Sequence, residues 1–264
     1  MIGTQMTDSS ESKLNIVNDH LDFPRISLTE STDSGYRHIA AAVDDPLLPI
    51  LPVYLFDSKE KQRLVAECKR LCDELAETDW VVDATVFKAV IHPPGRGEYL
   101  NQTDEDVHLA DFDVAVLIEV ENIPALQQLE ENNTYLTLES TLEDAARSFH
   151  VISGTNEKRI GPVDHDSDGV FLFNYFFAED IEQNLQVWEY TSGWFQAETG
   201  LDNSTLLLPL DSDRSEYTVI NHCRWDGLLD ILPALLFKRT FRTYVLENFE
   251  ANNVAPMPIL YKLA

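Results

Sequence analysis

The stretch YTVINHCRWDGLLDILPAL (Tyr217–Leu235) decides the fold, because an earlier segment of the chain follows the same pattern. That segment, FDVAVLIEVENIPALQQL (Phe112–Leu129), also opens on an aromatic residue, carries a Val two positions later and leaves through an acidic residue into a helical pattern. Both segments begin with the alternating, β-branched residues of a strand and end with apolar residues at helical spacing. This self-similarity, at an offset of about a hundred residues, indicates a duplicated unit.

The same order of predicted elements surrounds each copy. In the first half, strands are expected at Ile50–Phe56, Val81–Ile91, Phe112–Val120 and, weakly, Lys158–Val163, with helices from about Lys59 to Thr78 and from about Pro124 to Phe149, the latter broken near Asn132–Asn133. In the second half, strands are expected at Val170–Phe177, Ser204–Leu210, from Tyr217 onward and at Ala255–Leu263, with helices inside Ala178–Gly200 and from about Leu228 to Glu250. Each half therefore has the order β-α-β-β-α-β, which is the ferredoxin-like unit.

The predicted fold class is α+β, with two fused ferredoxin-like units at 46–165 and 166–264, the first of them degenerate. Residues 1–45 are polar and acidic and are expected to form a largely irregular N-terminal arm. Within this arm, the segment YRHIAAAV (Tyr36–Val43) is expected to pack on the body of the protein.

Composition narrows the class of function. The chain of 264 residues has a formal net charge of -27, which repels phosphate backbones and anionic membrane surfaces and makes nucleic-acid or membrane binding a poor expectation. No apolar run is long enough to cross a bilayer, and the N-terminus lacks the pattern of a signal peptide. Three cysteines form no disulfide pattern, so a soluble cytoplasmic protein is expected.

Two asparagines interrupt strand faces that should be apolar. In the first copy, one strand face carries Val116, and the equivalent residue of the second copy is Asn221. Asn174 likewise shares a face with Leu172 and Phe176. A buried amide without partners costs about 1–3 kcal/mol. Because the first and third strands of a ferredoxin-like unit are neighbours, both amides are predicted to meet over one pocket in the second half.

Each candidate residue also has a purely structural interpretation. Asn174 and Asn221 could be core amides bonded to a carbonyl or a water. His222 could be a general acid or base, or a packed neutral ring, which is the favoured alternative. The aromatic residues of the second half are candidate walls for a flat apolar ligand but are equally typical of a core: Phe176, Trp188, Trp194 and Trp225.

The segments FNYFFAED (Phe173–Asp180), VWEYTSGWFQAETGL (Val187–Leu201) and YTVINHCRWD (Tyr217–Asp226) resemble the antibiotic biosynthesis monooxygenase-like proteins of the dimeric α/β-barrel superfamily. The resemblance covers residues 170–264 well and about 50–165 only in outline. It implies that two ferredoxin-like units pack sheet to sheet as a barrel, with both units supplied here by one chain.

The resemblance also implies a function. Relatives include cofactor-free oxygenases of aromatic polyketides, polyketide cyclases and haem-degrading enzymes, and Asn174 matches a strand-one Asn that several oxygenases use near their ligand. The haem-degrading branch has an axial His on its second helix, whereas Leu228–Glu250 contains none, so no cofactor is expected. The expected function is a cofactor-independent monooxygenase or cyclase of secondary metabolism, acting on a small hydrophobic, aromatic or polyketide-like molecule. Its expected catalytic residues are Asn174, Asn221 and His222.

The alternative is a non-catalytic α/β barrel that binds a ligand or partner, and fused chains could pair further as homodimers. Three other motifs carry weaker expectations. DHDSDG (Asp164–Gly169) begins like a calcium loop but has Tyr175 where a bidentate Glu is required, so an acidic turn is expected and no metal. Cys68 and Cys72 resemble small core residues. PPGRGEYL (Pro93–Leu100) is expected to be a flexible loop or lid.

Overall fold

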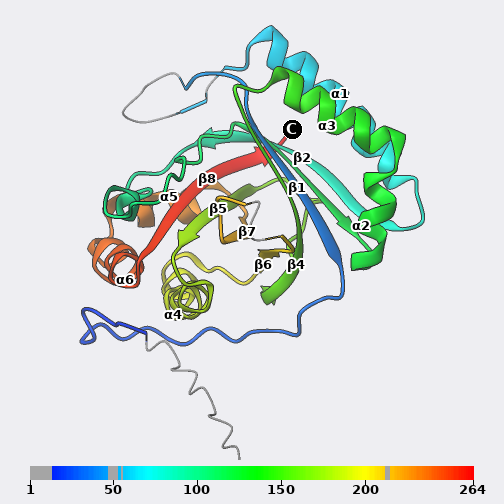
Figure 1. Cartoon of the computed structure of the whole chain (residues 1–264). Helices are drawn as coiled ribbons and strands as arrows, with labels where there is room; N and C mark the ends of the chain where they lie inside the picture. Colours follow the sequence, from blue (N-terminus) through cyan, green and yellow to red (C-terminus); the bar gives the residue numbers. More distant parts are fainter. Residues whose placement is uncertain (1–13, 47–52, 55, 212–214) are drawn as a thin grey trace, which may run out of the picture.

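The computed structural model describes residues 14–46, 53–54, 56–211 and 215–264. Within these ranges, eight antiparallel strands close into a barrel in the order β1-β3-β2-β8-β5-β7-β6-β4 (Figure 1). The strands are β1 (Gly35–Ala42), β2 (Val81–Ile91), β3 (Val114–Val120), β4 (Ser148–Gly161), β5 (Val170–Ala178), β6 (Ser204–Pro209), β7 (Val219–Trp225) and β8 (Val254–Leu263).

Helices cover the outside of the barrel. Around the first half lie α1 (Lys59–Ala76), α2 (Ile123–Glu130) and α3 (Asn133–Ala145), and around the second half lie α4 (Ile181–Thr199), α5 (Leu228–Phe237), the π-helix η3 (Phe241–Leu246) and α6 (Glu247–Ala251) (Figure 1). A short 3₁₀ helix, η1 (Glu98–Asn101), follows β2. The predicted break at Asn132 is confirmed, because its side chain accepts hydrogen bonds from the first backbone N–H groups of α3.

The predicted fold class is confirmed. Each half has the order β-α-β-β-α-β, and the first and third strands of each half are paired, β1 with β3 and β5 with β7. The pairs β2–β8 and β4–β6 join the halves and close the barrel. The two ferredoxin-like units of this one chain therefore form a single closed barrel.

The first strand differs from the prediction. It is Gly35–Ala42, within the segment expected to be a largely irregular arm. Most of the predicted strand Ile50–Phe56 lies outside the described residues, and Val53 makes only an isolated bridge with Ile91. The reason is pairing: β1 lies between β3 and β4 and so fills the central position that the apolar run was expected to take.

Strand alternation divides the apolar residues into three clusters. One fills the barrel interior and includes Phe87, Phe173 and Tyr175. A second lies between the sheet and the helices of the first half, and a third between the sheet and the helices of the second half. Successive residues of a strand point to opposite sides, so neighbours in sequence belong to different clusters.

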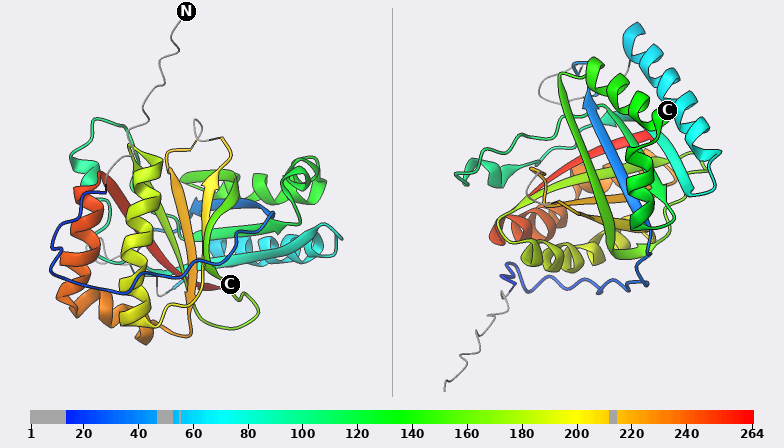
Figure 2. Two further views of the ribbon diagram at one scale, coloured as in Figure 1. Left: turned by 90° about the horizontal axis from the view of Figure 1, so that it is seen from below. Right: turned by 45° about the vertical axis from the view of Figure 1, so that its right-hand side comes forward.

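The arm before β1 is irregular as predicted, but it is docked. Residues 14–34 run across the helices of the second half (Figure 2). The Asn248 side chain accepts from the backbone N–H of Val17 at 2.9 Å and donates to its carbonyl at 3.1 Å. Asn252 makes the same pair with the backbone of Asn15, at 2.8 Å in both directions. Two side-chain amides, one on α6 and one at its C-cap, therefore hold the arm by the pair of backbone hydrogen bonds that a neighbouring strand would make.

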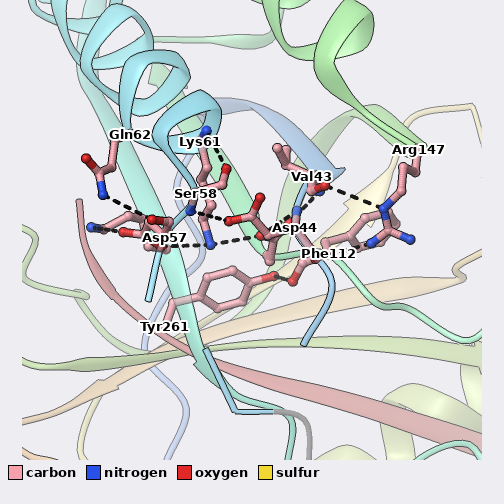
Figure 3. A network of polar contacts seen from close by, with 11 residues as sticks. Val43, Asp44, Asp57, Ser58, Lys61, Gln62, Phe112, Arg147 and Tyr261 are labelled. Atoms are coloured by element: carbon pink, nitrogen blue, oxygen red, sulfur yellow. Dashed lines mark hydrogen bonds and ion pairs between the residues drawn. The ribbon is translucent and has the colours of Figure 1, made fainter. Parts of the chain in front are cut away.

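A buried ion pair fixes α1 to the barrel (Figure 3). Lys61 and Asp113 are both fully buried, and Lys61 Nζ lies 2.8 Å from Asp113 Oδ2 and 3.1 Å from Asp57 Oδ1. The carboxylate of Asp113 also accepts from the backbone N–H groups of Val43, at 2.6 Å, and Asp44, at 3.1 Å. These contacts tie the end of β1 to the start of α1 and β3.

No helix in the described part of the chain is long and apolar enough to span a membrane.

Candidate functional site

The two asparagines singled out in the sequence are directly opposite each other. Asn174 on β5 is the register partner of Asn221 on β7, and both face the helices of the second half. Asn221 Oδ1 accepts a hydrogen bond from Ser204 Oγ at 2.5 Å. The Asn221 amide nitrogen lies 3.9 Å from the sulfur of Cys223. Asn221 therefore has partners of its own within the core.

Asn174 is different. Its Oδ1 is buried and has no hydrogen-bond partner among the described residues. The hydroxyls nearby are already used, since Thr191 Oγ1 donates to Val187 O at 2.8 Å and Ser192 Oγ donates to Trp188 O at 2.7 Å. An open carbonyl acceptor in an apolar setting requires a donor from a water or a ligand.

Two cavities adjoin Asn174. The inner cavity, of about 20 Å³, lies between α4 and the sheet, and the outer cavity, of about 30 Å³, lies between the sheet and α5, η3 and α6. Both have Asn174 in their walls, and the other residues common to both are Leu172, Phe195, Trp225 and Phe249. A water needs about 10–15 Å³, so each cavity has room for no more than one or two waters.

A surface groove of about 550 Å³ lies beyond the outer cavity, between the loop that follows β2 and the segment from α5 to α6. The groove and the outer cavity share Leu235, Phe241 and Leu246. These three side chains therefore form a partition between the solvent and the space beside Asn174. Phe241 and Leu246 are the two ends of the π-helix η3, a type of helix that is rare and often found at functional sites.

The predicted aromatic walls are only partly assembled here. Trp188 and Phe176 line the inner cavity, and Trp225 lines both cavities. Trp194 lines neither of these cavities: its Nε1 donates to Thr240 Oγ1 at 3.0 Å, and its ring lies 5.4 Å from that of Phe241. Trp194 therefore contacts Phe241, one of the three residues of the partition.

His222 does not belong to this site. It is adjacent to Asn221 on β7 and so points to the opposite side, into the barrel interior, where its ring stacks on Phe173 at 4.1 Å. Its Nδ1 donates to Leu172 O at 3.0 Å, which leaves Nε2 as an acceptor for Nε2 of His165 at 2.8 Å. Burial lowers the pKa of His222 well below its usual value. The ring is neutral and packed, so it is not an acid or base for the asparagine cavities.

Several lining residues carried no signal in the sequence. Leu246 and Phe241 lie on a π-helix, whose spacing does not follow the helical period, and Phe249 is one turn further along. Ser204, at the start of β6, is two residues from Leu206, the register partner of Asn221, and reaches Asn221 through its side chain.

The helical segment 228–250 offers no histidine that could bind the iron of a haem. The calcium-like motif forms a turn in which Asp164 Oδ1 accepts from the N–H of Asp166 at 2.8 Å. No group of three or more potential metal ligands gathers in the described part of the chain.

Known proteins match this chain in fold and not in sequence. Neither the protein-family models nor the curated proteins include a match. Among solved structures, an anthrone oxidase-like protein superposes with a TM-score of 0.62 at 10% identity, over 89% of this chain and 92% of its own. The fold is that of the dimeric α/β-barrel proteins. A proposed monooxygenase from Fusobacterium nucleatum superposes with a TM-score of 0.53 at 8% identity, over 88% and 93% of the two chains.

Proposed function

We propose that the chain is a cofactor-independent oxygenase of a small, electron-rich aromatic or polyketide-like molecule, which binds beside Asn174. The observation that carries the proposal is the open carbonyl of Asn174, buried between two cavities with aromatic walls. A phenolic or enolic hydroxyl is the donor that this acceptor lacks. The names of the two fold relatives, an anthrone oxidase-like protein and a proposed monooxygenase, agree with this class of substrate.

The chemistry needs little from the protein. The substrate loses a proton to solvent water, and the electron-rich anion reacts with O₂ itself at an adjacent CH₂ carbon; the peroxide formed there takes a proton back from water. That carbon loses two hydrogens and becomes a carbonyl; one atom of O₂ enters the product and the other leaves as water. Asn174 orients the hydroxyl, and the apolar walls exclude bulk water from the reacting carbon.

A ring system needs more room than the closed cavities provide. The partition of Leu235, Phe241 and Leu246 therefore has to open, joining the outer cavity to the surface groove. The groove also carries charged residues at its rim, among them Lys238, Arg239 and Glu247. We infer that the substrate arrives through the groove and that its polar substituents stay at this rim.

The test is oxygen uptake with product analysis on a panel of anthrones and polyphenols. Asn174→Ala removes the acceptor, Asn174→Leu replaces it with hydrocarbon of similar size, and Asn101→Ala, on the surface, is the matched control. We expect kcat/KM to fall about a hundredfold in both Asn174 variants and to be unchanged in the control. Equal turnover by wild type and Asn174→Ala would refute the role of this residue.

The second candidate is a non-catalytic barrel that binds a ligand or partner, for which the closed cavities need not admit both a substrate and O₂. Trp188 and Trp225 in the cavity walls provide its readout, because a bound aromatic molecule quenches their fluorescence. Quenching that saturates without any oxygen consumption or product would identify this second function.

A further inference from the structure

A second set of unpartnered polar atoms lies away from the asparagine cavities, at one end of the barrel interior. Arg96, in the loop after β2, has both Nε and Nη2 buried with no hydrogen-bond partner among the described residues. His92 Nε2 and Tyr54 OH are buried and unpartnered in the same way. The rings of Tyr54 and His92 are 5.2 Å apart, and the charge of Arg96 acts on both of them, so the three side chains lie together.

The loop is built to direct Arg96 inward. Arg96 stands between Gly95 and Gly97, whose φ angles of 78° and 63° lie in the left-handed region that glycine favours. The loop is anchored by the N–H of Gly97, which donates to Pro256 O at 2.8 Å, and by Tyr99 OH, which donates to Glu179 Oε1 at 2.6 Å. Tyr99 packs with the apolar residues of the barrel interior.

The surroundings of the guanidinium are mainly phenolic. Burial lowers the pKa of Arg96, against the raising effect of the hydroxyls of Tyr54, Tyr217 and Tyr261 and of the carboxylate of Asp111. Asp111 does not bond to the buried Nε and Nη2, which have no hydrogen-bond partner among the described residues. Asp113, the other carboxylate that acts on Tyr54, is paired with Lys61. The Nε–Nη2 edge of the guanidinium is therefore open.

The open atoms define the class of ligand. Nε and Nη2 form one edge of the guanidinium, and two parallel N–H donors on one edge match the two oxygens of a carboxylate. Burial lowers the pKa of His92 to about 3, so its ring is neutral. Its other nitrogen interacts with the carbonyl of Phe112, which leaves Nε2 as an acceptor for a hydroxyl.

We propose that Arg96, Tyr54 and His92 form a binding site for a small hydroxycarboxylate at the end of the barrel, separate from the asparagine cavities. The carboxylate takes the Nε–Nη2 edge of Arg96 with Tyr54 OH as a further donor, and the ligand hydroxyl donates to His92. The site does not depend on the proposed oxygenase activity.

The experiment is thermal unfolding of the full chain at pH 7.5 and constant ionic strength, with sodium lactate, acetate, phosphate or chloride. Binding to the folded state raises Tm, and about tenfold more ligand than Kd gives a rise of roughly 3 °C. We expect this rise with lactate, a smaller one with acetate, and neither in Arg96→Gln. Arg70→Gln is the control, because Arg70 is exposed and bonded to Glu67 and Glu74, and it should respond as wild type does.

A second readout covers the case in which Arg96→Gln does not fold. The Nε–H resonances of the arginines are recorded in wild type, and the Arg96 signal is assigned by its absence in Arg96→Lys. Lactate should shift this signal in a saturable way. The proposal is overturned if the signal does not move, if phosphate or chloride stabilises as much as lactate, or if Arg96→Gln keeps the lactate response.

Discussion

Acid should unfold this protein through histidines buried in neutral form, and His38 gives the sharpest test. His38 lies in the barrel interior, with Nδ1 at 3.2 Å from Val116 O, Nε2 at 3.0 Å from Tyr175 OH and its ring stacked 4.7 Å from Phe173. Burial, with a smaller effect from His150, lowers the pKa of His38 to about 3. Protonation would place a charge among the aromatic side chains of the barrel interior, which disfavours the charged form.

The sign and size follow from linkage. The unfolded state has an ordinary histidine pKa of about 6.5, so between pH 6.5 and 3 the unfolded chain binds one more proton than the folded chain at this site. The stabilisation is therefore complete above pH 6.5 and is lost as the pH falls. Each pH unit below 6.5 removes about 1.4 kcal/mol, so His38 alone removes about 2 kcal/mol from the free energy of unfolding between pH 7 and 5.

Other groups titrate in the same range, so the test is a difference between variants. Burial lowers the pKa of His92 to about 3 and of His150 to about 4, and both act in the same direction as His38. Protonating surface carboxylates acts oppositely, because it relieves the repulsion of the net charge of -27. His38→Gln keeps a hydrogen-bonding side chain but does not titrate; His20→Gln, on the exposed arm, is the control.

The assay is urea unfolding followed by circular dichroism at pH 7 and pH 5. The loss of unfolding free energy between the two pH values should be about 2 kcal/mol smaller in His38→Gln than in wild type, and unchanged in His20→Gln. Equal losses in His38→Gln and wild type would refute the assignment of a neutral, buried His38.

Two further predictions concern stability. Lys61→Met should lower the free energy of unfolding by about 3–5 kcal/mol in urea denaturation, because it leaves the buried carboxylate of Asp113 without its cation, and adding Asp113→Asn should recover part of this loss. Gly193→Ala should free the N-terminal arm, because a Cβ at this position would lie 1.7 Å from Pro24 O. Limited proteolysis should then cut within residues 14–34 faster, while the far-ultraviolet circular dichroism spectrum of the barrel stays the same. Unchanged protease resistance would contradict the docking of the arm on α4.

The asparagine pair could be predicted because strand alternation and strand adjacency are local rules. Val116 and Asn221 occupy equivalent positions of the two copies, and the first and third strands of such a unit are neighbours, so Asn174 had to lie near Asn221 once both strands were assigned. The same alternation separates His222 from Asn221. Adjacent residues of a strand point to opposite sides of the sheet, so His222 lies away from the candidate site, and its stacking on Phe173 agrees with the favoured interpretation of a packed neutral ring.

The position of β1 could not be predicted, because its polar residues find partners far away in the sequence. Arg37 donates to Tyr135 OH at 2.5 Å and to Ser153 Oγ at 2.7 Å, and His38 contacts Tyr175 OH. From sequence alone these residues belong to a largely irregular arm whose segment Tyr36–Val43 packs on the body, and the apolar run after Pro46 is the better strand. The volume of the cavities could not be predicted from the sequence either, because it depends on how helices far apart in the chain pack on the sheet.

The residues at one register position can be compared between the two halves of the barrel. In the first half, β1 and β3 place Ile39 opposite Val116, both fully buried against the helices. In the second half, β5 and β7 place Asn174 opposite Asn221 in the same register. The barrel therefore closes with hydrocarbon at this position, and folding alone does not require an amide there. Asn221 has Ser204 as a partner, whereas the oxygen of Asn174 has none among the described residues, at a cost of about 1–3 kcal/mol. Replacing a group that lowers stability and that folding does not need separates function from fold. Asn174→Leu, which copies the apolar residue of the first half, should therefore raise the free energy of unfolding while it lowers kcat/KM about a hundredfold.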